Sequence, residues 1–201
     1  MDWENQYLIN VTPWEKGEPA PPLDEWLERN GREISGRVLV PGCGLGHDCR
    51  ALAEHSGANE IIGLDISPEA VRRAGEFPVI GTERYEVGDL FDLEPDHLGS
   101  YDWVWEHTCF CAIEPGLRND YVEAVWSALR PRGTLLAVFY LNPYDDEHRP
   151  GGGPPHGATS EEIRERFEGS GRFRAIESYI PAVAYEGREG REQMTRFERL
   201  G

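Results

Sequence analysis

A glycine-rich loop between a short apolar strand and a helix constrains the fold of this chain more than any other feature. Residues 37–40 have the apolar character of a buried strand, and residues 47–54 have the pattern of the helix that follows. Between them, glycine stands at positions 42, 44 and 46. Glycine lets a backbone turn sharply and approach a ligand closely, and the free amides at a helix start attract acceptor groups. The loop therefore predicts a βα unit of a ligand-binding α/β domain.

The alternation of strand and helix continues along the chain. Further strands are predicted at residues 60–64, 85–87, 101–105 and 134–140. Further helices are predicted at residues 68–74, 119–129 and 160–167. After the last helix, residues 173–183 and 194–200 are predicted as a pair of strands. We therefore predict an α/β fold with a doubly wound, seven-stranded, Rossmann-like sheet that ends in an antiparallel hairpin.

The chain has the length of one ordinary domain and a strongly acidic composition. Its 201 residues predict a single domain, in which residues 1–30 form an amino-terminal lid over an edge or a pocket. A formal net charge of −17 repels phosphate backbones, so nucleic acid is not an expected partner. No apolar run is long enough for a membrane span and no secretory signal is visible, so we expect a cytoplasmic protein. We also expect it to be a monomer.

Two aspartates stand where predicted strands end. Asp65 follows the second strand, 19 positions after Gly46, where a carboxylate can accept hydrogen bonds from both ribose hydroxyls of an adenosine. Asp89 follows the third strand, where its carboxylate and the backbone amide of Leu90 can bind adenine. The alternative is that the glycines form a plain strand-to-helix turn and that the aspartates cap helices. We favour an adenosine cofactor because these features occur at three successive strand ends.

The spacing of the glycines decides between two adenosine cofactors. The dinucleotide fingerprint has a third glycine three places after the second, and that position here is His47. The tighter Gly-x-Gly-x-Gly spacing resembles that of S-adenosylmethionine-dependent enzymes. A sulfonium cation is attracted to aromatic faces, so the aromatic residues of the amino terminus, above all Trp14, are expected to cover it. The predicted cofactor is S-adenosyl-L-methionine, with S-adenosyl-L-homocysteine as its product.

Five sequence segments, spread over nearly the whole chain, resemble those of a known family. They are Val-Thr-Pro-Trp-Glu-Lys-Gly at 11–17, Val-Pro-Gly-Cys-Gly at 40–44, Phe-Cys-Ala-Ile-Glu-Pro at 110–115, Gly-Gly-Pro-Pro at 152–155 and Gly-Arg-Glu-Gly-Arg at 187–191. With them the chain resembles the thiopurine S-methyltransferase superfamily, and most closely its halide and thiol (thiocyanate) methyltransferase branch. The resemblance implies a class I methyltransferase sheet and an aromatic lid. The expected cofactor residues are Trp3, Tyr7, Trp14, Gly42, Cys43, Gly44, Asp65, Ile66, Asp89, Leu90, Glu106 and His107.

The segment after the fourth strand departs from this family. His107 and His156 stand where the halide and thiol branch usually has tyrosine. Glu106 and Cys109 stand where the family usually has aspartate and phenylalanine. His107 could deprotonate a thiol, pair with an anion or form only a pocket wall, because an imidazole can take either protonation state near neutral pH. Arg118 matches a family arginine and could anchor its loop or bind an anionic substrate.

These residues define the predicted reaction. The expected acceptor-binding residues are Trp14, His107, Cys109, Arg118 and His156, with His107 as the catalytic candidate. Methyl transfer to a sulfur or halide anion is an in-line displacement that depends on alignment and desolvation more than on proton transfer. We therefore predict a methyltransferase for a small thiol, bisulfide or related anion, with no metal site. The alternatives are halide or thiopurine methylation, methylation of nitrogen or oxygen in a small molecule, and a nucleotide-binding module without catalytic activity.

Overall fold

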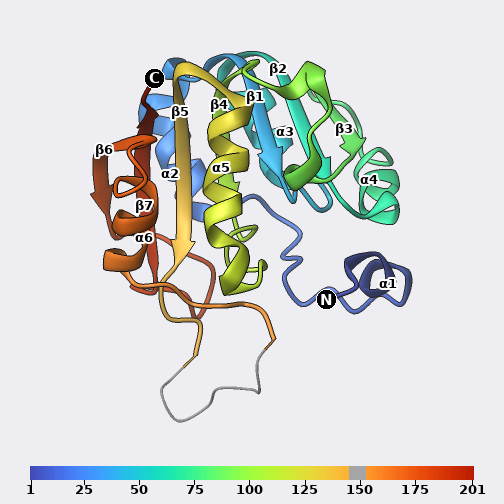
Figure 1. Ribbon diagram of the computed structural model, residues 1–201. Coiled ribbons are helices and arrows are strands. Elements are labelled where there is room, and N and C mark those ends of the chain that lie inside the picture. Colours follow the sequence, from blue (N-terminus) through green and yellow to red (C-terminus); the bar gives the residue numbers. More distant parts are fainter. Residues whose placement is uncertain (145–152) are drawn as a thin grey trace.

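The computed structural model describes residues 1–144 and 153–201, which fold around one mixed sheet of seven strands (Figure 1). The strands are β1 (Ser35–Pro41), β2 (Gly57–Asp65), β3 (Glu83–Val87), β4 (Tyr101–His107), β5 (Leu129–Tyr140), β6 (Phe173–Tyr179) and β7 (Glu192–Arg199). Their order across the sheet is β3-β2-β1-β4-β5-β7-β6. Strands β1 to β5 run parallel, and β7 runs antiparallel to both β5 and β6. The predicted doubly wound sheet with a terminal antiparallel hairpin is confirmed.

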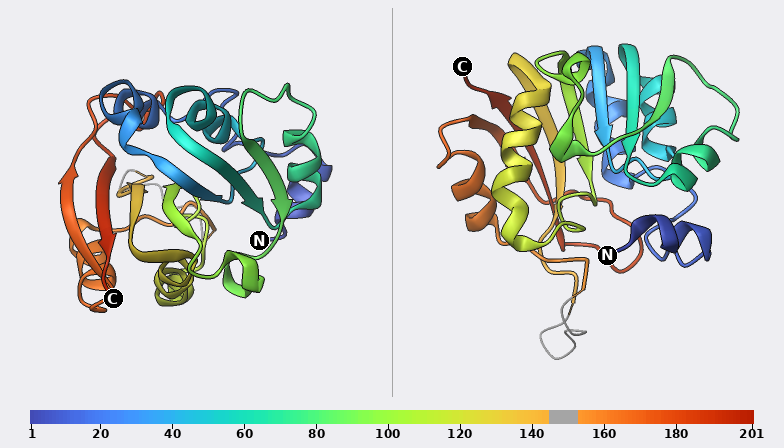
Figure 2. Two further views of the ribbon diagram at one scale, coloured as in Figure 1. Left: turned by 90° about the horizontal axis from the view of Figure 1, so that it is seen from above. Right: turned by 45° about the vertical axis from the view of Figure 1, so that its right-hand side comes forward.

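Helices cover both faces of the sheet. They are α1 (Trp3–Leu8), α2 (Pro21–Asn30), α3 (His47–His55), α4 (Pro68–Ala74), α5 (Arg118–Ala128) and α6 (Ser160–Phe167). Figure 2 shows α2 and α3 on one face and α5 and α6 on the other. Leu23 and Trp26 of α2 pack with Trp103 in the core of the first face. Phe139 and Phe167 belong to the core of the second face. Within the part of the chain that the structure describes, every helix is too short or too polar to cross a lipid bilayer.

The first 30 residues, predicted as a lid, consist of two different parts. Helix α1 lies near the carboxyl ends of the strands, toward the bottom of Figure 1, whereas α2 packs against α3. Helix α2 begins at Pro21, which the first turn of a helix accepts because no amide donor is needed there. Leu23, Trp26 and Leu27 are buried. Residues 21–30 are therefore part of the core, and only the segment before them is placed to cover a pocket.

Two strand boundaries differ from the predicted ones by four residues or more. β5 begins at Leu129, which pairs with Tyr101, rather than at residue 134. β6 ends at Tyr179 rather than at residue 183. Pro181 follows shortly after, and proline has no amide hydrogen to donate to a neighbouring strand. Local sequence thus placed the strands correctly but not all of their ends.

The strand order brings the predicted site residues to one edge of the sheet. The chain passes from β1 to β2 on one side, whereas β4 lies on the other side of β1, so the order reverses between β1 and β4. Ligands of open α/β sheets bind at such a reversal, beyond the carboxyl ends of the strands. The glycine loop follows β1, Asp65 ends β2, Asp89 follows β3 and His107 ends β4.

Candidate active site

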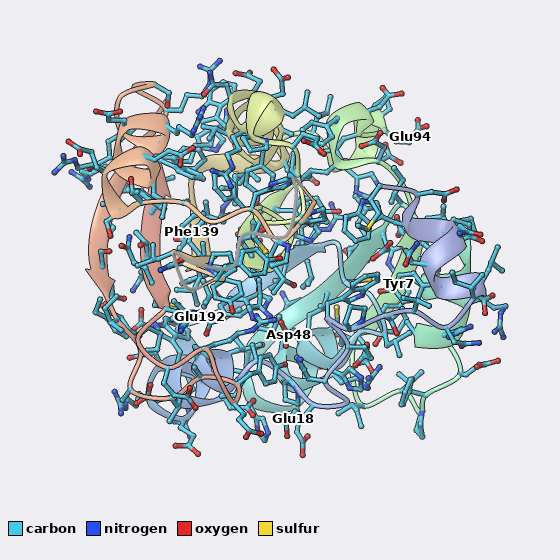
Figure 3. The ribbon with its side chains drawn as sticks, turned by 90° about the horizontal axis from the view of Figure 1, so that it is seen from below. Tyr7, Glu18, Asp48, Glu94, Phe139 and Glu192 are labelled. Carbon is cyan, nitrogen blue, oxygen red and sulfur yellow. The ribbon has the colours of Figure 1, made fainter. Side chains whose placement is uncertain are left out.

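A cavity of about 700 Å³ lies at the carboxyl ends of β1 to β4, within the size range of small-molecule sites. Its walls come from α1 and the segment after it, the glycine loop, the strand ends, and the residues around Tyr140 and Tyr185. Figure 3 shows this edge from below, with Tyr7 on one side and with Asp48 and Glu192 near the centre of the view. The predicted site residues in the wall are Trp3, Tyr7, Trp14, Gly42, Cys43, Gly44, Asp65, Ile66, Asp89, Leu90, His107 and Cys109.

The three glycines of the loop all take positive φ angles: 61° at Gly42, 53° at Gly44 and 74° at Gly46. Residues with a side chain rarely adopt this backbone conformation. A Cβ atom on Gly44 would lie 2.9 Å from the hydroxyl oxygen of Tyr7, and one on Gly46 would lie 2.3 Å from the ring of Tyr85. Glycine is therefore required at both positions for the backbone angle and for space, and the loop can pass close to Tyr7.

Asp65 is held at the end of β2 by two backbone amides. Its Oδ1 accepts a hydrogen bond from the amide of Ser67, and its Oδ2 accepts one from the amide of Gly44, both at 2.9 Å. Burial raises the pKa of Asp65, although these two hydrogen bonds act in the opposite direction. A carboxylate has about four lone-pair sites, so each oxygen keeps one for a ligand donor. At the next strand end, Asp89 accepts a hydrogen bond from the amide of Phe91 at 2.8 Å.

Trp3, Tyr7 and Trp14 form an aromatic cluster in the part of the cavity wall that comes from the amino-terminal segment. The ring of Trp14 meets the rings of Trp3 and Tyr7 edge to face, with centroid distances of 5.2 and 5.8 Å. The indole nitrogen of Trp14 donates a hydrogen bond to the hydroxyl of Tyr7 at 3.1 Å. Edge-to-face pairs of this kind stabilise the relative orientation of aromatic rings. The cluster thus presents an ordered aromatic surface beside the glycine loop.

Two polar contacts attach this wall to the rest of the domain. Glu4 on α1 accepts hydrogen bonds from the side chain of Ser67 and the amide of Glu69, at the start of α4. Glu15, next to Trp14, lies with Oε1 2.9 Å from Nε2 of His47, at the start of α3. Burial alone would raise the pKa of Glu15, but the hydrogen bonds from His47 and from the backbone lower it. The aromatic cluster is therefore held by contacts on both sides.

His107, at the end of β4, lies between two carboxylates from distant parts of the chain. Its Nδ1 is 3.5 Å from Oδ2 of Asp48 on α3, and its Nε2 is 3.9 Å from Oε1 of Glu192 on β7. Only 8% of the side chain is exposed. Burial alone would lower the pKa of His107, but the two carboxylates outweigh burial and raise the pKa to about 9. The two carboxylates therefore favour the imidazolium form of His107 at neutral pH.

Arg188 is a second cation in the cavity wall, and the sequence analysis did not assign it to the site. Its guanidinium carbon lies 4.7 Å from the ring centre of Tyr140 and 5.4 Å from that of Tyr185. Its Nη1 is 3.2 Å from Oε1 of Glu192. The resemblance of residues 187–191 pointed to this segment but could not show that Arg188 reaches a cavity formed by the opposite end of the chain.

Glu106 does not line the cavity, which corrects its predicted place among the cofactor residues. The side chain is fully buried, where Oε1 accepts a hydrogen bond from the amide of Phe110 at 2.8 Å and Oε2 accepts one from the hydroxyl of Tyr121. Burial raises the pKa of Glu106 to about 7. Successive residues of a strand point to opposite faces, so Glu106 points to the face covered by α5 while His107 points to the face covered by α3.

Arg118 and His156 also lie outside the cavity wall, which corrects their predicted contact with an acceptor. Arg118 is 1% exposed and pairs with Glu162 at 2.9 Å. It also donates hydrogen bonds to the carbonyl oxygens of His156 and Gly157, at 2.8 and 3.1 Å. Arg118 therefore anchors the segment before α6, whereas the sequence analysis had expected it to anchor its own loop or to bind an anionic substrate. Gly152, the first residue of the predicted segment 152–155, lies outside the described residues.

Comparison with known proteins adds a family and several relatives. The family model described as thiopurine S-methyltransferase matches residues 1–198 of this chain. A probable thiol methyltransferase 2 of Arabidopsis thaliana is 33% identical, with 98% of this chain and 84% of the relative covered. Thiocyanate methyltransferase 1 of Brassica oleracea is 30% identical, with the same coverage of both chains.

A solved structure supports the fold. It is that of 1,6-didemethyltoxoflavin-N1-methyltransferase from Burkholderia thailandensis with bound 1,6-didemethyltoxoflavin and S-adenosylhomocysteine. It superposes on this chain with a TM-score of 0.72 and 18% identity, and it covers 100% of this chain and 86% of its own. This likeness concerns the arrangement of helices and strands.

Proposed function

Because the chain belongs to the thiopurine S-methyltransferase family, as its sequence predicted, we propose that it methylates a small thiol, bisulfide or a related anion. It is an S-adenosylmethionine-dependent S-methyltransferase, with S-adenosyl-L-homocysteine as the product of its cofactor. When bound, the cofactor supplies a methyl group on a cationic sulfonium. Which acceptor takes this methyl group depends on the residues in the cavity wall toward β4 and β5.

The residues present fit this cofactor. Asp65 has lone pairs left for the ribose hydroxyls, and Asp89 with the amide of Leu90 would hold the adenine at the neighbouring strand end. The glycine loop approaches closely enough for its backbone to contact a ligand, because no Cβ atoms stand in the way. The faces of Trp14 and its aromatic neighbours would lie against a cation and exclude water.

One observation carries the choice of acceptor: two cationic side chains, His107 and Arg188, stand in the cavity wall toward β4 and β5. Tyr140 and Tyr185 flank them with aromatic rings. Asp48 and Glu192 balance these two positive charges overall, but Glu192 does not line the cavity, whereas both cations do. A cation at the surface of a partly dry cavity attracts an anion and favours the thiolate over the thiol, whose ordinary pKa is about 8.5. This end of the cavity therefore suits a small anionic nucleophile better than a neutral amine or alcohol.

The chain's own residues then have little proton transfer to perform. Both ring nitrogens of His107 lie near carboxylates, so His107 acts as a fixed positive charge and not as a base. Cys109 lines the cavity, but burial raises the pKa of its thiol well above the ordinary value, which makes it a poor nucleophile. The protein's remaining contributions to catalysis are alignment of the two reactants and exclusion of water. Alignment alone can lower the activation barrier of methyl transfer by about 7 to 11 kcal/mol.

The acceptor assignment is tested with purified enzyme, methyl-labelled S-adenosyl-L-methionine and a panel of acceptors. The panel holds bisulfide, thiocyanate, small thiols, iodide, a thiopurine, an amine and a phenol. We expect the sulfur anions to be methylated with the highest kcat/KM, and we expect Asp65→Ala to abolish transfer to all of them by loss of the cofactor. Transfer to the amine or phenol alone would overturn the proposal, and iodide as the best acceptor would reassign the enzyme to halides.

A further inference from the structure

Two carboxylates face the ring of His107, one toward each ring nitrogen. Asp48 reaches it from the first turn of α3, and Glu192 reaches it from the first residue of β7. The other titratable groups that face this cluster are Tyr140 at the end of β5, and Tyr185 and Arg188 before β7. Glu106, the preceding residue of β4, also interacts electrostatically with His107, but its side chain accepts a hydrogen bond from Tyr121 on the other face of the sheet.

Asp48 has a carboxylate whose two oxygens are both fixed by donors. Its Oδ1 accepts a hydrogen bond from the amide of Ala20 at 2.8 Å, and its Oδ2 accepts one from the indole nitrogen of Trp105 at 2.7 Å. Burial opposes ionisation of Asp48, but the hydrogen bonds from His107 and Trp105 lower its pKa below the ordinary value. The carboxylate is therefore ionised and immobile, and it faces Nδ1 of His107 from a fixed direction.

Glu192 faces the second nitrogen. Nε2 of His107 and Oε2 of Glu192 are both buried, and neither has a hydrogen-bond partner among the described residues. Buried polar groups without partners cost free energy, and the cost is larger for a charged carboxylate. An imidazolium at His107 offsets part of this cost by attraction to the carboxylate, whereas a neutral imidazole does not. Nε2 is also withdrawn from the cavity surface, so it is not available to take a proton from an acceptor.

We propose that Asp48 and Glu192 are positioning residues that hold His107 as a permanent imidazolium, with each ring nitrogen facing one of the two carboxylates. The inference deepens the proposed function and rests on it for the identity of the acceptor. In this arrangement the imidazole ring supplies a buried positive charge, and its two flanking carboxylates keep that charge in place.

The test is a titration of His107 by NMR, with carbon-labelled histidine side chains in the full-length enzyme. The signal of His107 among the six histidines is assigned by its loss in His107→Gln. We expect the wild-type signal to titrate near pH 9. In Asp48→Asn and in Glu192→Gln the midpoint should fall by about 1 to 3 pH units, the usual effect of one opposite charge. Two separate variants keep the test decisive if one of them folds poorly by circular dichroism.

Glu198→Gln is the matched control. Glu198 lies on the same strand as Glu192 and pairs with Arg132 and Arg174 at the surface, outside the cavity. Its variant should leave the titration of His107 unchanged. KM for thiocyanate, which is an anion throughout this pH range, provides a kinetic readout. KM should rise as His107 loses its proton, and this rise should occur at a lower pH in Asp48→Asn than in the wild type. The effect on kcat should be smaller, which a general loss of structure would not produce.

A wild-type midpoint near 6.5, or midpoints unchanged in both variants, would overturn the inference. These outcomes are separate from those of the acceptor panel, because the titration needs no turnover. If His107 titrates near pH 9 while no sulfur acceptor is methylated, the positioning role stands and the proposed acceptor is wrong. If sulfur acceptors are methylated while His107 titrates near 6.5, the proposed function stands and the positioning role is wrong.

Discussion

The indole nitrogen of Trp14 donates a hydrogen bond to the hydroxyl oxygen of Tyr7 at 3.1 Å, and the same hydroxyl lies where a side chain on Gly44 would have to go. This pair joins the segment after α1 to the glycine loop, so the aromatic wall and the cofactor loop have a common contact. Cofactor affinity should therefore depend on Tyr7 even though its role is to hold Trp14.

Tyr7→Phe removes the acceptor for the indole and keeps the ring. Since a neutral hydrogen bond contributes about 0.5 to 1.5 kcal/mol, the dissociation constant for S-adenosyl-L-homocysteine should rise about two- to tenfold by calorimetry. Trp126→Phe is the control, because the Trp126 indole also donates a hydrogen bond, to the carbonyl of Leu200, away from the cavity. An unchanged dissociation constant in Tyr7→Phe would mean that Trp14 is held without this bond.

Asp65→Asn should weaken binding of the same ligand by about ten- to hundredfold, the range for hydrogen bonds to charged groups. The amide nitrogen of asparagine cannot accept a hydrogen bond. The asparagine side chain would therefore lose the hydrogen bond from one of the two backbone amides, and it would have fewer acceptor sites for the ribose hydroxyls. Asp102→Asn is the matched control, since Asp102 also accepts from a backbone amide, that of Arg37, outside the cavity. Equal affinity for wild type and Asp65→Asn would place the ribose elsewhere.

Arg188→Met should raise KM for anionic acceptors about tenfold or more, because the guanidinium faces the cavity. It should also lower the melting temperature, because the buried carboxylate of Glu192 loses an ion-pair partner. Initial rates with thiocyanate and with a small thiol measure KM. Arg196→Met serves as the control: Arg196 likewise stacks on an aromatic ring, that of Trp103 at 5.2 Å, and pairs with Glu33, but it does not line the cavity. A KM that stays at the wild-type value would remove Arg188 from acceptor binding.

Arg118→Met should lower the free energy of unfolding and leave ligand binding in the cavity unchanged. Loss of a buried ion-pair partner costs about 3 to 5 kcal/mol, and we expect about 2 to 4 kcal/mol here because Glu162 keeps its contact with Arg166 and is partly exposed. Urea unfolding followed by circular dichroism measures the free energy of unfolding. The folded variant should bind S-adenosyl-L-homocysteine with wild-type affinity, and a selective loss of acceptor turnover without loss of stability would contradict the anchoring role.

The contribution of His107 to stability should depend on pH in a defined direction. Its folded-state pKa of about 9 lies above the value of about 6.5 for an unfolded chain. A raised pKa stabilises the fold fully below the unfolded value, and the stabilisation is lost as the pH rises through about 9. The difference in free energy of unfolding between wild type and His107→Gln should thus be largest below pH 6.5 and shrink toward pH 9. A difference that grows with pH would show that His107 is neutral in the folded protein.

Much of the fold could be predicted because its signals are local. The apolar strands, the proline at the start of α4 with its Ser67 cap, and the glycine positions each depend on neighbouring residues. Helix α2 was missed because two prolines and a short polar stretch conceal its buried side, which only the contact with α3 defines. Within the site, the residues at the ends of β1 to β3 could be placed because parallel strands end at one edge of the sheet.

The sequence by itself determined where the chain turns, which strand ends carry acids and which loop needs glycine, because these properties follow from residue type and spacing. Only the tertiary structure decided which long side chains reach the cavity. Arg118 and Arg188 are the same residue type, yet one is buried beneath the segment before α6 and the other lies in the wall beside Tyr140. Likewise, the charge of His107 depends on Asp48 and Glu192, which come from distant parts of the chain. Burial and the position of opposite charges set a pKa, and both exist only once the sheet has assembled.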